Sequence, residues 1–447
     1  MLIAFRTTNF RAFRDPQELS LRRARGLRSG GDDPDWDSSI SPVAAIYGAN
    51  ASGKSTLYAA LEYLHRAVRD SYNRWTVGGS THVLPFRLDP GTERQPSDFE
   101  IEFRAKDGVD YVYGFRAARK QIEAEWLYAY RTPSRTTLFE RDVENISFGN
   151  TFRGSRIAID EAASSRKNSL VLSIAAQLGN ETVLAAYNWI VTQLRTYDAR
   201  EYGAEHMHIM DMIDEEPGIA EQLADVLSRA DLGIRDLQIV DRDVSRDDME
   251  RVLGLVRELM GSSESESERD EEFAERFSRT LQLTHTGTDG AVPFPLSWES
   301  EGTRALLSFA SIALKALNSG STIVVDEIDS SLHPLLVAEL LSLFAREETN
   351  PRQAQLIVTT HDVTLLNAAG HGDGLLKRDQ IWLTEKGPDG AASLVALSEY
   401  RTPRASENLA RGYLTGRYGG IPMLSVFEGF ASRSASGGEN EAFHAVK

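Results

Sequence analysis

Residues 48–55 read GANASGKS, which fills every fixed position of a G-x-x-x-x-G-K-[ST] phosphate-binding loop. In such a loop, backbone N–H groups and the positive end of a helix dipole face a polyphosphate. Lys54 is expected to reach the β- and γ-phosphates, and the hydroxyl of Ser55 is expected to ligate Mg²⁺. The predicted nucleotide-binding residues here are Gly48, Asn50, Ser52, Gly53, Lys54, Ser55 and Thr56.

Three polar residues further along the chain suit the chemistry of a bound triphosphate. Asp326 ends the apolar run TIVVD, and an aspartate in that position beside a phosphate loop can hold Mg²⁺. Glu327 follows at once and is suited to orient and polarise an attacking water. His361 comes soon after the apolar run QLIVT, where it can contact the γ-phosphate and sense its loss. Each feature alone is a common polar cap, so the prediction depends on their combination.

A second anion site is predicted at Ser300 and Gly302, which form a Ser-x-Gly turn before a strongly apolar stretch. These polar residues need regular elements to position them. The apolar runs 43–47, 322–326 and 355–359 predict buried strands, and helical spacing predicts helices over 56–65 and 305–317. The sequence therefore predicts a strand, a phosphate loop and a helix, with carboxylates and a histidine at neighbouring strand ends.

The order of these motifs resembles that of the ATP-binding-cassette (ABC) ATPases: Walker A, signature turn, Walker B with its glutamate, then switch histidine. In that family two heads sandwich two ATP molecules. The resemblance implies that Ser300 and Gly302 act in trans on the partner's nucleotide, with Glu327 as catalytic base and His361 as switch residue. It also implies ATP and Mg²⁺ as cofactors and a head-to-head homodimer, or a higher oligomer.

Finer features resemble the OLD (overcoming-lysogenization-defect), RecF and SMC-like branch of that superfamily. The segment Asn9-Phe10-Arg11 looks like the opening strand of SMC-type and RecF-type heads. Residues 326–334, DEIDSSLHP, are similar to OLD and RecF-like ATPases, in which His-Pro replaces an aspartate of transporters. Residues 411–422 are similar to stand-alone OLD-like AAA family ATPases without a Toprim domain, many of them in bacterial phage-defence operons.

The predicted fold is α/β, a P-loop NTPase of the ABC-ATPase type, with a mixed sheet, an antiparallel β subdomain and an inserted helical lobe. Alternating apolar residues over 99–130 predict the antiparallel strands. Residues 155–275 are expected to be mainly helical, and their many glycines argue against a long coiled-coil arm. The expected division is 1–150 and 281–447 for the two parts of the ATPase head, and 151–280 for the lobe with the acidic run 262–272.

The composition of the chain limits how it is expected to interact with membranes and nucleic acid. The chain has 447 residues, no cysteine and a formal net charge of −17, and it contains no apolar run long enough to span a bilayer. We therefore expect a cytoplasmic protein that does not enter membranes. An acidic chain repels the phosphate backbone, so nucleic acid is expected to bind only weakly unless a local basic patch forms, such as the arginines within 22–28.

The resulting functional prediction is an ATP-hydrolysing, dimeric switch that controls an effector, a nuclease or toxin encoded nearby, in anti-phage defence. Two alternatives remain open. One is a DNA repair or recombination ATPase of RecF or SMC type that binds DNA directly. The other is the ATPase subunit of a transporter, which the His-Pro of residues 333–334 and the motif at residues 9–11 disfavour.

Overall fold

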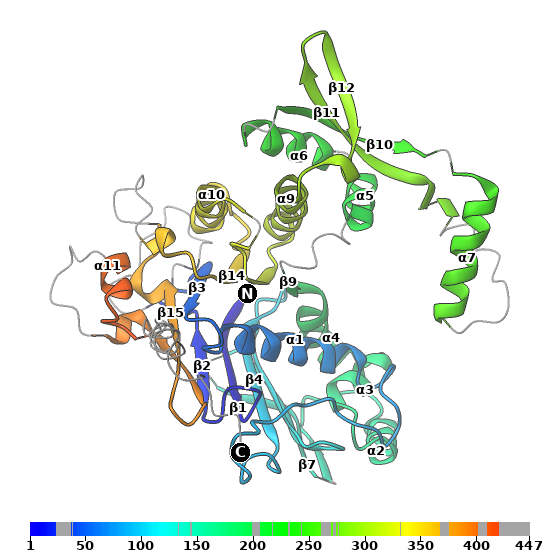
Figure 1. The fold of residues 1–447 in the computed structure, drawn as a ribbon. Helices are drawn as coiled ribbons and strands as arrows, with labels where there is room; N and C mark the ends of the chain where they lie inside the picture. The colour runs from blue at the N-terminus through cyan, green and yellow to red at the C-terminus, as the bar shows by residue number, and fades with distance from the viewer. Residues whose placement is uncertain are drawn as a thin grey trace, which may run out of the picture.

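The computed structural model describes residues 1–23, 37, 39–132, 134–143, 145–198, 206–216, 218–230, 233–242, 244–260, 270, 274–275, 277–330, 332–366, 375–400 and 409–419. Three β-sheets, of seven, six and three strands, organise this part of the chain. Figure 1 shows the six-stranded sheet between the seven-stranded sheet and a lobe that carries the three-stranded sheet.

The central sheet has the strand order β16-β15-β3-β14-β13-β9, and β16 alone runs antiparallel to its neighbour. Its strands are β3 (Val43–Gly48), β9 (Leu194–Asp198), β13 (Thr322–Asp326), β14 (Gln355–Thr359), β15 (Ile381–Lys386) and β16 (Ala392–Ala396). The strands predicted over 322–326 and 355–359 are confirmed with those bounds. Because β3, β14 and β13 are parallel neighbours, their carboxyl ends meet at one edge of the sheet.

Every residue of β3 is buried, and its side chains alternate between two hydrophobic cores. Val43, Ala45 and Tyr47 belong to one core, whereas Ala44 and Ile46 belong to the other. A strand covered on both faces reads as a continuous apolar run, which explains why the sequence revealed it.

The first core joins the central sheet to helix α1 (Lys54–Asp70) and to the seven-stranded sheet. That sheet is antiparallel throughout, in the order β2-β1-β4-β5-β6-β7-β8, which confirms the predicted antiparallel subdomain. Its strands are β1 (Leu2–Thr8), β2 (Gln17–Ser20), β4 (Ser97–Arg104), β5 (Asp110–Ala117), β6 (Ile122–Tyr130), β7 (Thr136–Asp142) and β8 (Asn145–Phe148). Helices α2 (Arg156–Ser165), α3 (Val171–Gln177) and α4 (Glu181–Asn188) also pack into this core.

Asn9, in the turn after β1, connects this subdomain internally. Its side-chain amide donates hydrogen bonds to the carbonyl oxygens of Thr92, Gln95 and Pro96 at 2.8–3.1 Å, and its Oδ1 accepts the N–H of Phe86 at 3.1 Å. Its φ of 54° lies in the left-handed region, which asparagine tolerates better than most residues. The asparagine therefore has a structural role in joining β1 to the segment before β4.

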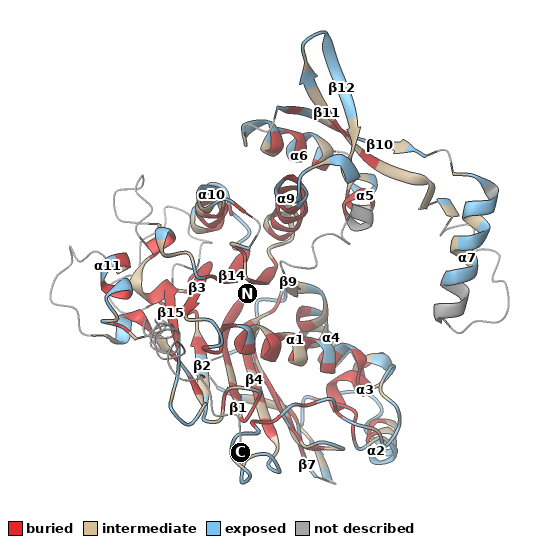
Figure 2. Cartoon of the chain, in the orientation of Figure 1, coloured by how far each residue is buried: buried red, intermediate tan, exposed pale blue. Residues whose placement is uncertain are grey.

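The second core covers the opposite face of the central sheet with helices α9 (Glu301–Ser319) and α10 (Pro334–Ala345). Beyond them lies the lobe, which contains α5 (His206–Glu215), α6 (Gly218–Arg229), β10 (Ile234–Asp241), α7 (Arg246–Met260), β11 (Arg279–Gly287), β12 (Gly290–Pro295) and the 3-10 helix η3 (Leu296–Trp298). Figure 2 shows that the tip of the β11–β12 hairpin and much of α7 are exposed.

The expectation that residues 155–275 are mainly helical needs two corrections. β9 pairs with β13 in the central sheet, so residues 194–198 belong to the head, whereas the prediction assigned them to the lobe. β10 is a strand of the lobe's own antiparallel sheet, where Leu237 packs in the same core as α6. Both strands depend on pairing with distant residues, which outweighs local helical pattern. The divisions at residues 150 and 280 otherwise stay a prediction, and most of the acidic run 262–272 lies outside the described residues.

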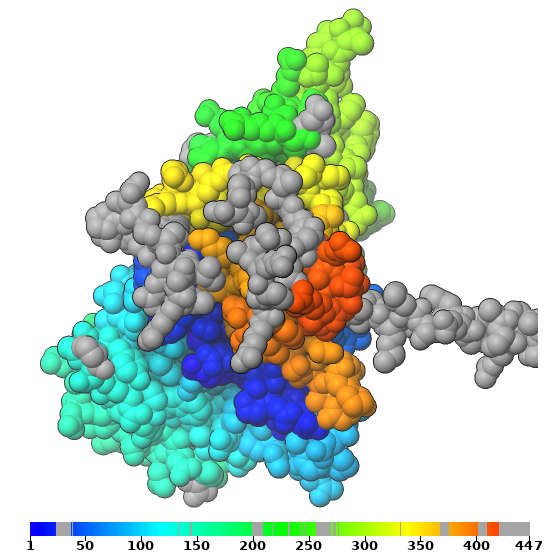
Figure 3. All heavy atoms as spheres, turned by 90° about the vertical axis from the view of Figure 1, so that its left-hand side faces the viewer, coloured from blue at the N-terminus to red at the C-terminus, as the bar shows by residue number. Residues whose placement is uncertain are grey.

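The described C-terminal part returns to the head through the 3-10 helices η4 (Val363–Leu366), η5 (Arg378–Gln380) and η6 (Leu397–Glu399), and ends in α11 (Leu409–Leu414). Figure 3 shows these segments, in orange and red, beside the N-terminal residues in blue. Arg14 forms an ion pair with Asp389 at 2.7 Å, and the N–H of Ala392 donates to the carbonyl oxygen of Ala12 at 2.8 Å. In the described part of the chain, no helix combines the length and apolarity that crossing a bilayer requires.

Candidate functional site

The predicted phosphate loop connects β3 directly to α1. β3 ends at Gly48, α1 begins at Lys54, and Gly53 caps the helix with a φ of 116°. No side chain of the described residues caps this helix end. The N–H of Thr56 donates to the carbonyl oxygen of Gly53 at 3.0 Å, and the N–H groups of Lys54 and Ser55 before it remain available to an anion. In the loop, Asn50 and Ser55 are exposed whereas Ser52 and Thr56 are buried. The loop therefore has the form of a phosphate site.

Two glycines of the loop are required by close packing against the C-terminal strands. A Cβ on Gly48 would lie 2.2 Å from Oγ1 of Thr384, and a Cβ on Gly53 would lie 2.7 Å from Cβ of Ala392. The hydroxyl of Ser52 lies 2.5 Å from that of Thr384, within hydrogen-bonding distance. Strands β15 and β16 therefore brace the loop, and Thr384 is a loop-positioning residue that the sequence analysis missed.

Lys54 is folded back onto the loop and is only 8% exposed. Its Nζ donates to the carbonyl oxygens of Gly48 at 2.6 Å and Ala49 at 3.1 Å. Burial lowers the pKa of the Lys54 ammonium, and nearby carboxylates partly oppose this effect. Those carboxylates belong to Asp329, Glu327 and Asp326. The lysine and the predicted Walker B residues therefore share one electrostatic environment.

Asp326 and Glu327 are arranged by one threonine at the end of the neighbouring strand. Asp326 ends β13 and is 1% exposed, and its Oδ1 accepts the hydroxyl of Thr359 at 2.5 Å. The same hydroxyl accepts the backbone N–H of Glu327 at 2.8 Å. Glu327 has a φ of 53°, an uncommon conformation for a non-glycine residue. Thr359 therefore fixes the turn at which the two consecutive carboxylates diverge.

His361 lies close to this turn because β14 lies between β3 and β13. The N–H of Thr360 donates to the carbonyl oxygen of Ile46 in β3 at 3.0 Å, which holds the segment beside the phosphate loop. Nδ1 of His361 lies 2.9 Å from Oδ2 of Asp329, and the ring side chain is 65% exposed. The structure thus brings His361 to the same sheet edge as the loop and the two carboxylates.

Ser300 and Gly302 lie at the start of α9, and no hydrogen bond of the described residues links them to that group. Ser300 is the N-cap of α9, and its hydroxyl accepts the N–H of Thr303 at 3.1 Å and lies 2.8 Å from Oγ1 of Thr303. Both residues are exposed, and no hydrogen bond of the described residues joins the Ser300 side chain to the phosphate loop. The helix start is formed and accessible, as a site that acts on another molecule requires.

His285 connects the lobe to the residue before this helix start. Its Nε2 lies 2.7 Å from Oε1 of Glu299, whose side chain is 7% exposed, and its ring lies 5.0 Å from that of Phe294. Trp298 is 73% exposed and packs 5.8 Å from Phe294. Through these contacts the β11–β12 hairpin holds the segment that leads to Ser300.

His333 has a local role. It is the N-cap of α10, and its Nδ1 accepts the N–H of Leu335 at 3.3 Å, while Pro334 takes the first position of the helix. Proline is favoured there because the missing N–H would have no partner in the helix. The His-Pro pair therefore serves as a helix start.

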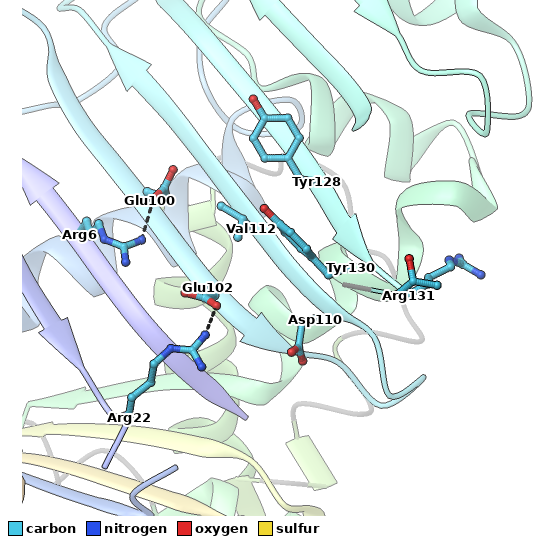
Figure 4. Close-up of a pocket in the computed structure, with 10 residues that line it drawn as sticks. Arg6, Arg22, Glu100, Glu102, Asp110, Val112, Tyr128, Tyr130 and Arg131 are labelled. Atoms are coloured by element: carbon cyan, nitrogen blue, oxygen red, sulfur yellow. Dashed lines mark hydrogen bonds and ion pairs between the residues drawn. The ribbon is translucent and has the colours of Figure 1, made fainter. Parts of the chain in front are cut away.

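The candidate basic patch begins on the outer face of the seven-stranded sheet (Figure 4). There Arg22 is ion-paired with Glu102, and Arg6 with Glu100 at 2.9 Å. Arg23 is 8% exposed, and burial lowers the pKa of its guanidinium. The other two arginines of the patch, at positions 25 and 28, lie outside the described residues. The described arginines of the patch are thus paired or buried.

The fold and the loop together define a P-loop nucleotide-binding protein. Residues 43–367 match the family described as "AAA domain, putative AbiEii toxin, Type IV TA system". The chain belongs to this family, and its α/β fold with an antiparallel subdomain confirms the predicted fold class, with a lobe that contains both helices and strands. A search of curated proteins finds no match to this chain.

Several solved structures are similar to the chain at low identity. The SMC head domain from Thermotoga maritima is 14% identical, with 88% of this chain and 98% of that chain covered and a TM-score of 0.38. The Smc head domain bound to ScpA from Pyrococcus furiosus is 14% identical, with coverages of 89% and 97% and a TM-score of 0.41. The recombination mediator RecF is 14% identical, with coverages of 89% and 98% and a TM-score of 0.30.

Proposed function

We propose that this chain binds ATP with Mg²⁺ and hydrolyses it at the carboxyl ends of β3, β13 and β14. The observation that carries the proposal is the strand order β3-β14-β13, which gathers Lys54, Asp326, Glu327 and His361 at one edge. The open N-terminus of α1 and Lys54 would hold the phosphates. Glu327 would orient the attacking water, because phosphoryl transfer depends mainly on positioning and electrostatics.

The residues present fit a magnesium ion. Ser55 supplies an exposed hydroxyl at the start of α1, and Asp326 supplies a carboxylate at the end of β13. Mg²⁺ prefers oxygen ligands and usually takes the remainder from phosphates and water. When bound, the ion would neutralise charge on the β- and γ-phosphates.

The strand order also supports one direction for the bound nucleotide. The carboxylates of β13 lie on one side of β3 and β15 lies on the other, so the nucleoside should extend toward β15 and β16. A cavity of about 390 Å³ lies on that side, beside the turn between β15 and β16. Its lining combines the cations Arg11, Arg87 and Lys386 with apolar Leu84 and Leu88. Such a lining suits an apolar base joined to an anionic phosphate chain.

The proposed assembly is a head-to-head dimer in which Ser300 and Gly302 act on the partner's nucleotide. The support is that this helix start is exposed and makes no contact with its own phosphate loop among the described hydrogen bonds. The exposed Trp298 beside it gives the same surface an apolar residue to bury.

We further propose that the ATP cycle controls a partner effector in anti-phage defence. The family description names a putative toxin of a toxin–antitoxin system, which supports such a setting. The net charge of −17 and the paired arginines of the outer sheet support a protein partner over direct DNA loading. The lobe, which is joined to the residues before Ser300 through His285 and Glu299, is the proposed docking region.

Nucleotide binding and phosphate release by the wild type and by Lys54→Ala test the proposal. We expect the wild type to bind ATP and release phosphate, and the variant to lose both, because the buried ammonium is the main cation of the loop. Equal turnover by the two proteins would remove this site from the reaction.

A further inference from the structure

Asp329 is a buried carboxylate whose partners lie on one side only. Its side chain is 4% exposed, and Oδ2 accepts the backbone N–H of His361 at 3.1 Å and lies 2.9 Å from Nδ1 of the same residue. The other oxygen, Oδ1, is buried and has no hydrogen-bond partner among the residues that the structure describes. Leaving a buried carboxylate oxygen unpaired costs free energy, so stability alone does not explain an aspartate here.

The contact with Asp329 favours one tautomer of His361. A carboxylate oxygen accepts a hydrogen bond from a ring N–H, so the 2.9 Å contact favours a proton on Nδ1. Nε2 lies on the opposite side of the ring and points away from Asp329. The ring is 65% exposed, so this second nitrogen is accessible to a ligand.

The position of the pair relates it to the phosphate loop. Together with Glu327 and Asp326, Asp329 acts electrostatically on Lys54 and opposes the lowering of its pKa by burial. Thr360, the residue before His361, is bonded to Ile46 two residues before the loop begins. The imidazole is therefore held from one side by Asp329 at the sheet edge where the terminal phosphate is proposed to lie.

We propose that Asp329 is a positioning residue, which fixes the tautomer and orientation of His361 so that Nε2 is presented to the terminal phosphate of the bound nucleotide. The inference rests on the proposed ATPase function of the same site. It assigns to Asp329 the task of holding an imidazole in one tautomer, as the orienting carboxylate of a catalytic triad does. In this proposal Asp329 acts through His361 and not by contact with the nucleotide.

The first test is a spectroscopic one and needs no nucleotide. The protein is labelled with ¹⁵N-histidine, and the His361 resonances are assigned by their loss in His361→Gln. We expect the wild type to show His361 with its proton on Nδ1. Asp329→Ala should shift His361 toward the Nε2–H tautomer. Asp329→Asn, which keeps an acceptor oxygen and the shape, should retain more of the Nδ1–H form.

Asp362→Asn is the matched control, because Asp362 is the next residue after His361. Its carboxylate accepts hydrogen bonds from the backbone N–H and the hydroxyl of Thr364, both at 2.9 Å. We expect this variant to leave the tautomer of His361 unchanged. A wild-type protein with the proton on Nε2, or a tautomer that does not respond to Asp329→Ala, would overturn the assignment.

The second test separates binding from turnover. Asp329→Asn and Asp329→Ala should lower kcat by about ten- to a hundredfold, as loss of an orienting partner commonly does, while the Kd for ATP changes less than about threefold. The double variant with His361→Gln should be no slower than His361→Gln alone, because both changes remove one function. Additive losses would contradict the proposal. Absence of hydrolysis by the wild type would refute the proposed function, and the tautomer measurement would still decide the role of Asp329.

Discussion

The hydroxyl of Thr359 lies 2.5 Å from Oδ1 of Asp326, so the end of β14 controls the aspartate at the end of β13. The same hydroxyl receives the N–H of Glu327, whose backbone is in the left-handed region. One side chain thus organises both predicted Walker B residues.

Replacing Thr359 with valine keeps the shape and removes the hydroxyl. We expect kcat for ATP to fall by about tenfold or more, because Asp326 and the turn at Glu327 lose their common partner, with a loss of stability of about 1–3 kcal/mol. Thr322→Val is the control, since Thr322 is a buried threonine of β13 that bonds Gln355 at 2.8 Å at the other end of the strand. Equal kcat values for the two variants in a phosphate-release assay would contradict this role.

The trans action of the helix start predicts complementation between two inactive proteins. Ser300→Arg should bind ATP but not hydrolyse it, and Lys54→Ala should not bind it. A mixture should recover activity at one composite site per mixed dimer. Loss of a helix cap costs about 1 kcal/mol, so Ser155→Arg, which removes the N-cap of α2, controls for that loss. Wild-type turnover by Ser300→Arg would exclude the shared site.

Glu125 predicts a pH-dependent stability. It is buried, and burial raises the pKa of its carboxyl to about 7, although the N–H groups of Leu172 and Val171 and the charge of Arg141 oppose the shift. A carboxyl whose folded pKa is raised stabilises the fold fully below its unfolded value near 4.5, and this contribution is lost as the pH rises through about 7.

The thermal melting temperature of the wild type should therefore fall relative to that of Glu125→Gln between pH 5 and pH 8. The raised pKa of Glu125 corresponds to a change of at most about 3 kcal/mol in the free energy of unfolding. Glu140→Gln is the control. Each glutamate accepts a tyrosine hydroxyl, Glu125 that of Tyr113 at 3.1 Å and Glu140 that of Tyr128 at 2.8 Å, but Glu140 is exposed. If the difference in melting temperature between the wild type and Glu125→Gln is the same at pH 5 and pH 8, the raised pKa of Glu125 is wrong.

Direct DNA loading predicts a different outcome from effector control. With a net charge of −17 and Arg22 and Arg6 ion-paired, the purified chain should bind duplex DNA only weakly near physiological salt, with or without ATP. Fluorescence anisotropy over a salt series measures this. Tight, ATP-dependent binding that Arg22→Ala weakens would favour the repair ATPase.

Much of the site was predictable because its strands are buried on both faces. The runs that became β3, β13 and β14 are continuously apolar, and Lys54, Asp326 and Glu327 follow or end them, so local pattern located these residues. The position of His361, two residues after β14, followed from the same reasoning. Their roles in catalysis stay predictions.

The positioning residues were not predictable in the same way. Thr384 meets the phosphate loop only because β15 pairs with β3, a contact between residues more than 300 positions apart. Thr359 looked like an ordinary strand residue. Asp329 lay in the segment 326–334, and the sequence pattern predicted no partner for its carboxylate. β9 and β10 were missed for a related reason, since strands formed by distant pairing carry little local signal.

The most direct measurement compares ATP binding and turnover in the wild type, Glu327→Gln and Glu339→Gln, where Glu339 is exposed on α10 and serves as the matched control. We predict that all three bind ATP and that the control turns over like the wild type. Glu327→Gln should be slower by at least about a hundredfold, because the attacking water loses its oriented acceptor. Wild-type turnover by Glu327→Gln would show that this glutamate is not the catalytic base.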